Sequence, residues 1–250
     1  MHRFVKTATF ILIIAFGFAQ AAPADIYLKQ KRQTDAVTIM GQTQPAEDVI
    51  SEIWITPDGI RSNTDGESTI MMLDEQKIIL VNHTDKTYRV RPMGMDKMME
   101  KSVKGQSPEE KAEMQGMMKN MMKMDVSVAA TGQTRTIRGW NCQKYRLTMD
   151  TMMGKIVNEV WATQDLKVDQ KLYDRLNTAM MGAMPGMQQG LKDIQDEMKK
   201  IKGVQVKTIS TQQIMGKDRT TTTELLDYKE AEAPAGLLEI PSGYSEKKQK

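Results

Sequence analysis

The fold is decided by residues 49–82, which read VISEIWITPDGIRSNTDGESTIMMLDEQKIILVN. Short β-prone runs alternate here with compact turn signals, a pattern typical of an antiparallel meander. Thr56-Pro57-Asp58-Gly59 is such a turn, because proline presets φ and glycine accepts the positive φ that other residues resist. The runs 49–55 and 77–81 are apolar on both alternating faces. A sheet built from them needs cover on both sides, or curls so that its concave face encloses something.

Outward from this stretch, the same alternation predicts further strands. In residues 142–149, Tyr145 and Leu147 fall on one face and Lys144 and Arg146 on the other, which is the alternation of a half-buried strand. The expected strands are 26–30, 37–40, 49–56, 60–63, 69–73, 77–82 and 87–90 in a first block, and 125–129, 135–138, 142–149, 156–163, 205–214 and 220–228 in a second.

Two segments change to a helical period. Methionines recur on one helical face of residues 109–124, and Ser107-Pro108 ahead of them is a helix start signal. A second apolar stripe runs through residues 169–201 and is interrupted at Pro185-Gly186, which predicts two helical segments hinged at the proline. These helices are expected to cover the sheet, with a Met-rich helical insertion at about 93–124 between the two β blocks.

The N-terminus has the three parts of a cleavable secretory signal. Arg3 and Lys6 precede an apolar run over residues 8–18, and Ala19-Gln20-Ala21 fits a small-x-small cleavage site. Residues 1–21 are therefore expected to be removed, with cleavage near Ala21 or Ala22, and residues 22–250 to form one domain in the periplasm. The apolar run is too short to span a bilayer, and no later stretch is longer, so the mature form is expected to have no transmembrane segment.

Charge and single residues exclude several classes of function. The chain has 35 basic and 32 acidic residues, and because two of the basic ones lie in the signal, the mature net charge is about +1. This balance does not indicate a nucleic-acid binder. Cys142 is the only cysteine and can form no internal disulfide; we interpret it as a buried strand residue. His83 is the only mature histidine, so no catalytic triad or histidine-based metal site is expected, and the protein is expected not to be an enzyme.

The order of short motifs resembles a known family. Glu52-Ile53-Trp54-Ile55, Gly139-Trp140-Asn141-Cys142, Glu159-Val160-Trp161-Ala162 and Ile240-Pro241-Ser242-Gly243-Tyr244 occur in the order seen in the bacterial domain-of-unknown-function family numbered 4412. More distantly the chain is similar to the periplasmic lipoprotein carriers of the LolA and LolB type. The resemblance implies an α+β fold, a curved antiparallel β half-barrel with a helical lid on the concave side and a cavity able to hold acyl chains.

The methionines allow three interpretations. The chain has 23 of them, and ten lie between Met93 and Met124. They can fill the interface between helices and sheet, since a thioether fits irregular gaps. They can form an adaptable apolar surface for a flexible ligand. They can also act as soft ligands for Cu(I), or as oxidant buffers through sulfoxide formation.

From these patterns we predict a non-enzymatic periplasmic binding or carrier protein for an apolar ligand, a lipid or a lipoprotein acyl chain. The alternative is a Met-rich periplasmic protein that handles copper or buffers oxidants. No cofactor, metal site or catalytic residue is predicted. The candidate ligand-binding residues, in cavity or lid, are Met114, Met117, Met118, Met121, Met122, Met180, Met181 and Met184.

Overall fold

The computed structural model describes residues 25–93, 107, 125–151, 154–167 and 188–247. The first block of the chain forms eight strands: β1 (Ile26–Thr34), β2 (Val37–Ile39), β3 (Gln42–Gln44), β4 (Glu47–Ile55), β5 (Gly59–Thr64), β6 (Glu67–Met72), β7 (Lys77–Asn82) and β8 (Thr87–Pro92). The second block forms β9 (Asp125–Ile137), β10 (Trp140–Thr151), β11 (Gly154–Thr163), helix α4 (Gln188–Met198), β12 (Val204–Ile214), β13 (Lys217–Glu230) and β14 (Ser245–Glu246).

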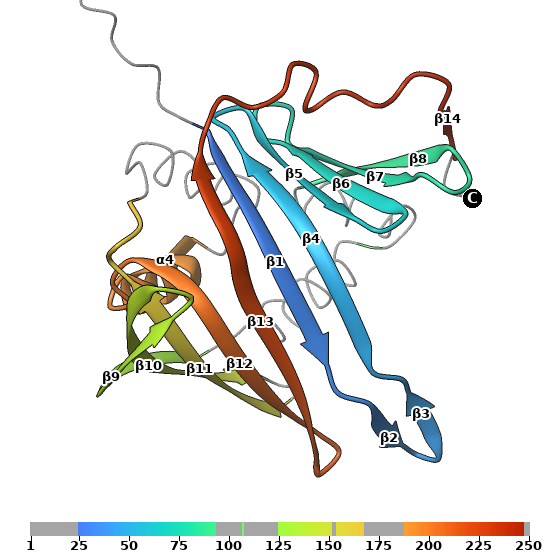
Figure 1. Cartoon of the computed structure of the whole chain (residues 1–250). Helices are drawn as coiled ribbons and strands as arrows, with labels where there is room; N and C mark the ends of the chain where they lie inside the picture. The colour runs from blue at the N-terminus through green and yellow to red at the C-terminus, as the bar shows by residue number, and fades with distance from the viewer. Residues whose placement is uncertain (1–24, 94–106, 108–124, 152–153, 168–187, 248–250) are drawn as a thin grey trace, which may run out of the picture.

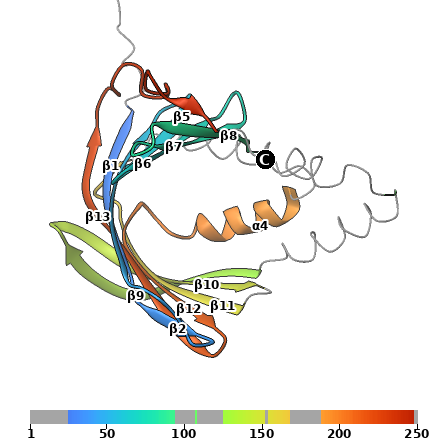
Figure 2. The ribbon, with the colours of Figure 1, turned by 90° about the vertical axis from the view of Figure 1, so that its right-hand side faces the viewer.

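Twelve strands form one continuous sheet in the order β14-β8-β7-β6-β5-β4-β1-β13-β12-β11-β10-β9. All neighbours are antiparallel except β14, which runs parallel to β8. The pairing of β1 with β13 joins the two blocks at the middle of the sheet (Figure 1). The sheet does not close into a barrel. It curves strongly, and α4, within the described part of the chain the one helix, lies on its concave side (Figure 2).

The two expected strands 125–129 and 135–138 are one long strand, β9, and this corrects the sequence prediction. Gly132 has φ +75°, and the register between β9 and β10 shifts opposite it, so the strand continues through a β-bulge. The Thr131 hydroxyl donates to the carbonyl oxygen of Lys144 at 3.0 Å and bridges the bulge. A glycine that indicates a turn in the sequence thus marks an irregularity inside a pair of strands.

The other expected strands are present, with ends that shift by up to four residues. The short pair β2–β3 extends beyond β1 and β4, and β14 arises from the C-terminal segment. The long helical prediction over 169–201 is confirmed for α4 over residues 188–198, whereas 199–201 lie beyond its end. The Met-rich helix over 109–124 and the hinge at Pro185 lie outside the described residues.

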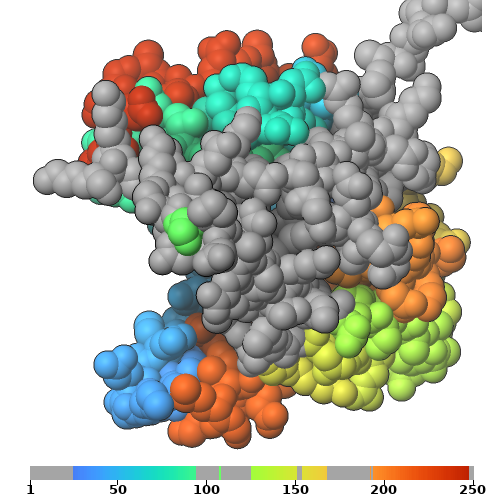
Figure 3. All heavy atoms as spheres, turned by 180° about the vertical axis from the view of Figure 1, so that it is seen from behind, coloured from blue at the N-terminus to red at the C-terminus, as the bar shows by residue number. Residues whose placement is uncertain are grey.

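Two clusters of buried side chains hold the two ends of the sheet. At the β9–β11 end, Tyr145, Leu147 and Val160 pack with Met198 and Ile201 from the end of α4 and the turn after it. At the β6–β8 end, Ile70, Ile79 and Val81 are covered by residues of the C-terminal segment, namely Leu238, Ile240 and Tyr244. The space-filling view shows this segment, in red, against the teal and green strands (Figure 3).

Helix α4 is tied to the edge strand by a charged hydrogen bond. The carboxylate of Glu197 accepts a hydrogen bond from the backbone N–H of Val128 at 2.8 Å and also forms an ion pair with Lys200. The backbone N–H of Lys202 donates to the Tyr145 hydroxyl at 3.3 Å just after the helix. These contacts place α4 inside the curve of the sheet.

Candidate ligand-binding face

The inner face of the sheet can be followed from strand to strand by register. Val160 packs toward α4, and its row continues through Thr208, Thr223 and Arg32 to Val49 on β4. Side chains two residues apart on a strand share a face, so Ile53 and Ile55 also belong to this side. The concave face therefore continues from the α4 end of the sheet across β4 to β8.

A row of aliphatic side chains crosses this face. Ile55 pairs with Ile60, Ile60 with Met71, and Met71 with Ile78. All four are half-buried. Side chains opposite each other on neighbouring strands lie in direct contact range, so the row is a continuous apolar strip about four strands wide.

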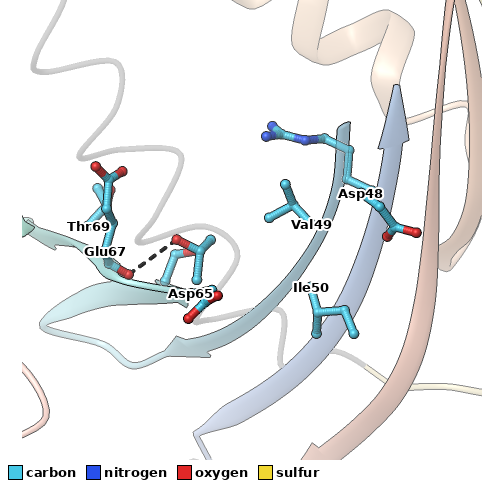
Figure 4. Close-up of a pocket in the computed structure, with 9 residues that line it drawn as sticks. Asp48, Val49, Ile50, Asp65, Glu67 and Thr69 are labelled. Atoms are coloured by element: carbon cyan, nitrogen blue, oxygen red, sulfur yellow. Dashed lines mark hydrogen bonds between the residues drawn. The ribbon is translucent and has the colours of Figure 1, made fainter. Parts of the chain in front are cut away.

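A cavity of about 590 Å³ opens farther along β4 to β6, toward the β5–β6 turn, and none of the four residues of the row lines it. Its lining includes Val49 from β4 and Glu67 and Thr69 from β6. Figure 4 shows Val49 directed toward Thr69, with the carboxylate of Asp48 turned away on the other side of β4. The cavity is thus lined by a mixture of aliphatic, hydroxyl and charged side chains.

Three arginines lie on the concave face without a charged partner. Arg32 is in the row of Val49, Arg89 is paired with Leu80, and Arg91 is paired with Ile78. Among the described residues none of the three makes an ion pair or a side-chain hydrogen bond, and the Nε of Arg91 is buried without an acceptor. An unsatisfied buried donor costs about 1–3 kcal/mol, more when it is charged. Arg32 and Arg89 are exposed to solvent, so among the three arginines this cost applies to Arg91.

Asn158 is a second unsatisfied donor on the same face. It pairs with Leu147 and Ser210 and is 5% exposed. Its Nδ2 is buried without an acceptor among the described residues. The concave side therefore carries unused donors at both ends of the sheet.

On the convex face, several lysines are paired with carboxylates across strands. Lys29 pairs with Glu52 at 3.0 Å, and Lys31 with Asp48 at 2.9 Å. Lys144 pairs with Glu159 at 3.0 Å and lies over the ring of Trp161. Lys207 pairs with Glu224 at 3.3 Å. These pairs form a ladder of alternating charges over the outside of the central strands, which we call the convex charge ladder.

Cys142 lies in the strand interior, in agreement with its interpretation as a buried strand residue. It is 2% exposed, and its Sγ contacts the carbonyl oxygen of Trp140 at 3.5 Å. Burial raises the pKa of the thiol, which lowers the fraction of reactive thiolate. This environment is that of an unreactive structural cysteine.

His83 has partners that the sequence did not indicate. Its ring nitrogens lie 2.6 Å from the Ser68 hydroxyl and 2.8 Å from the Tyr244 hydroxyl. The guanidinium group of Arg61 donates a hydrogen bond to the carbonyl oxygen of Leu237 at 2.9 Å. Ser68 is 2% exposed and so cannot be approached by a substrate. The network attaches the C-terminal segment to the sheet.

The eight methionines predicted as ligand-binding residues all lie outside the described residues. The features found instead are the aliphatic row, Arg89, Arg91 and Asn158. Alternation in the sequence shows that Arg89 and Arg91 share one face of their strand, but it does not tell which face of the sheet is the inner one. Their lack of partners depends on the register of the whole sheet.

In the described part of the chain, no group of three or more His, Cys, Asp or Glu side chains is arranged to hold a metal ion. None of the described helices is both long and apolar enough to cross a membrane.

A search of curated proteins found no match to the chain. The family model described as domain of unknown function (DUF4412) matches residues 37–244, which include all the sheet strands except β1 and β14. This range covers most of the chain and confirms the family resemblance indicated by the tryptophan-containing motifs. The chain therefore belongs to the DUF4412 family.

Proposed function

We propose that the protein is a non-enzymatic carrier that binds the acyl part of a lipid or lipoprotein on the concave face of its sheet. The observation that carries this proposal is the aliphatic row from Ile55 to Ile78, which is half-buried and lies on the inner side of a curved, open sheet. A strip of this kind offers apolar contact along the length of a chain-like ligand. Binding sites for small apolar ligands are concave and largely apolar, with a few polar groups that fix orientation.

The proposal includes a LolA-like form of the fold. A LolA-like half-barrel has a concave acyl-binding side and a helical lid, and the inner position of α4 is compatible with the start of such a lid. The Met-rich segments 93–124 and 180–187 would complete it as an adaptable apolar cover. Transport of a lipid between membranes would place the protein in the periplasm, as its N-terminal signal predicts.

The alternative of copper handling or oxidant buffering depends on methionines outside the described residues. It stays a prediction, and the same preparation tests it. Cu(I) retained in stoichiometric amount after dialysis would favour it over the carrier.

Displacement of a hydrophobic fluorescent dye tests the carrier function. We expect the dye to bind the purified protein and long-chain fatty acid to displace it. Native mass spectrometry of the gently purified protein should show co-purifying lipid. Absence of dye binding, together with a lipid-free mass, would show that the concave face is filled by the protein's own side chains.

Variants of two neighbouring strands, β6 and β7, identify the binding face. Replacing Met71 and Ile78 by serine places hydroxyls in the aliphatic row and should weaken dye and fatty-acid binding. The control replaces Val90, which is exposed on the convex face of β8, by serine. Equal loss in both variants would contradict the assignment to the concave face.

A further inference from the structure

The aliphatic row ends beside two arginines on β8, Arg89 and Arg91. We propose that Arg89 and Arg91 bind the anionic headgroup of a single-chain amphiphile whose tail lies along the aliphatic row. The inference rests on the proposed carrier function and deepens it, because it names the class of ligand and its orientation.

Position is the first argument. The row Ile55–Ile60–Met71–Ile78 ends on β8 at Arg91, which pairs directly with Ile78. Strands are spaced about 4.8 Å apart, so the row from β4 to β7 spans about 14 Å before the arginine. An extended acyl chain lying across the strands would therefore reach Arg91 with its polar end.

The second argument is the unused hydrogen-bonding capacity at this end. The Nε of Arg91 is buried without an acceptor. Arg89, two residues away on the same face, is exposed to solvent and has no ion-pair partner among the residues described. Several lysines of the convex face, by contrast, are paired across strands, as Lys29 is with Glu52. An anion bound from outside the chain would satisfy donors that the described part of the protein leaves unsatisfied.

Geometry favours a carboxylate or phosphate over a neutral polar group. Arg89 and Arg91 are two residues apart on one face of β8, which places their Cα atoms about 6.6 Å apart. Two guanidinium groups at this spacing can converge on one anion, and each can present a pair of parallel N–H donors to its oxygens. A hydroxyl or amide head would leave most of these donors without acceptors.

Isothermal titration of the purified protein with matched twelve-carbon ligands tests the inference. We expect dodecanoate and dodecyl phosphate to bind about tenfold or more tightly than dodecanol, because hydrogen bonds to charged groups exceed neutral ones by this amount. Inorganic phosphate alone should bind far more weakly than dodecyl phosphate. If it bound equally well, the site would be one for a free anion and the amphiphile would be excluded.

The variants Arg91→Gln and Arg89→Gln, singly and together, show whether the arginines are responsible. Each is expected to weaken dodecanoate binding about tenfold and to leave dodecanol binding unchanged. Arg146→Gln is the matched control, because Arg146 is exposed on the convex face. Circular dichroism verifies that each variant is folded.

The outcomes separate this inference from the carrier function on which it rests. Binding of dodecanol and dodecanoate with equal affinity, unchanged in the arginine variants, would keep the carrier and overturn the headgroup site. Absence of binding for all twelve-carbon ligands would overturn both. Equal weakening of dodecanol and dodecanoate by Arg91→Gln would assign the arginine a structural role and also contradict the inference.

Discussion

The two faces of the sheet differ in the surroundings of some of their charged side chains. On the convex face, Lys29, Lys31, Lys144 and Lys207 each pair with a carboxylate on a neighbouring strand or close to it. On the concave face, Arg89 and Arg91 have no such partner among the described residues and flank aliphatic side chains. Charges that serve only solubility are tolerated outside, where water solvates them. The buried Nε of Arg91, left without an acceptor beside an apolar strip, supports the proposal that the inner face binds another molecule.

Ile78 and Ile79 allow the two faces to be compared directly, because they are neighbours in β7 and point to opposite faces of the sheet. Ile79 is 2% exposed under the C-terminal segment, whereas Ile78 is half-buried in the concave row. Ile79→Ala is expected to lower the free energy of unfolding by about 2–4 kcal/mol through the cavity it leaves. Ile78→Ala should cost only about 1 kcal/mol, since less apolar surface is lost.

Urea unfolding followed by tryptophan fluorescence measures both effects, and ligand binding gives the complementary result. Ile78→Ala should weaken fatty-acid binding more than Ile79→Ala does at a temperature where both variants are folded. Similar stability losses and similar affinities for the two variants would remove the functional distinction between the faces.

Substitutions of Asn158 test whether an unsatisfied polar group on the inner face lowers the free energy of unfolding. Its Nδ2 is buried without an acceptor, so Asn158→Leu is expected to raise the free energy of unfolding by about 1 kcal/mol by removing the unsatisfied group at similar volume. Thermal unfolding of the ligand-free protein is the measurement. Asn158→Ala serves as the comparison, because it also removes the amide but leaves a cavity. A loss of stability in the leucine variant would show that the amide has a stabilising partner.

The convex charge ladder should contribute little energy per pair. A double-mutant cycle on Lys29 and Glu52, with Lys29→Gln and Glu52→Gln, is expected to give a coupling of about 0.2–1 kcal/mol that decreases with salt. Arg32→Gln on the concave face should leave stability unchanged, because no partner among the described residues is lost. A coupling near zero for the convex pair, or a clear loss for Arg32→Gln, would break the contrast.

The smallest expected effect is local and depends on pH. Hydrogen bonds from Lys200 and from the Val128 N–H hold the pKa of Glu197 below its usual value. The contribution of this carboxylate is therefore complete above the pKa of the unfolded chain and is lost as the pH falls through the lower folded value. The hydrogen-exchange protection factor of the Val128 amide should decrease on acidification in the wild type and remain constant, at a lower level, in Glu197→Gln. A wild-type protection factor that does not change with pH would show that α4 is held without this bond.

The sequence predicted the strands well because their alternation is a local property. Tyr145 and Leu147 fall on one face in the sequence and are buried together in the structure. The strand β9 was divided in two because Gly132 resembles a turn residue, and only the partner strand shows that it accommodates a bulge. Family membership was also accessible, since several short motifs in a fixed order are specific.

The candidate site was less accessible for a physical reason. A period of two tells which residues share a face, but the inner side of a sheet is set by the curvature of all its strands. Arg91 and Asn158 are polar residues in strands, and nothing near them in the sequence shows that they lack partners. The unusual number of methionines therefore led to a site predicted at methionines. The unpaired donors of Arg91 and Asn158 can be recognised only when the positions of all the strands in the sheet are known.

Photoaffinity labelling tests the central claim most directly. A long-chain fatty acid with a photoreactive group on its tail is irradiated with the protein, and the labelled residues are located by mass spectrometry, with unlabelled fatty acid as competitor. We expect competed labels on the concave side of β4 to β7, at Ile60, Met71 or Ile78, and on the Met-rich segments. Labels confined to convex residues such as Arg146, or labels that the competitor does not reduce, would contradict a ligand-binding function for the concave face.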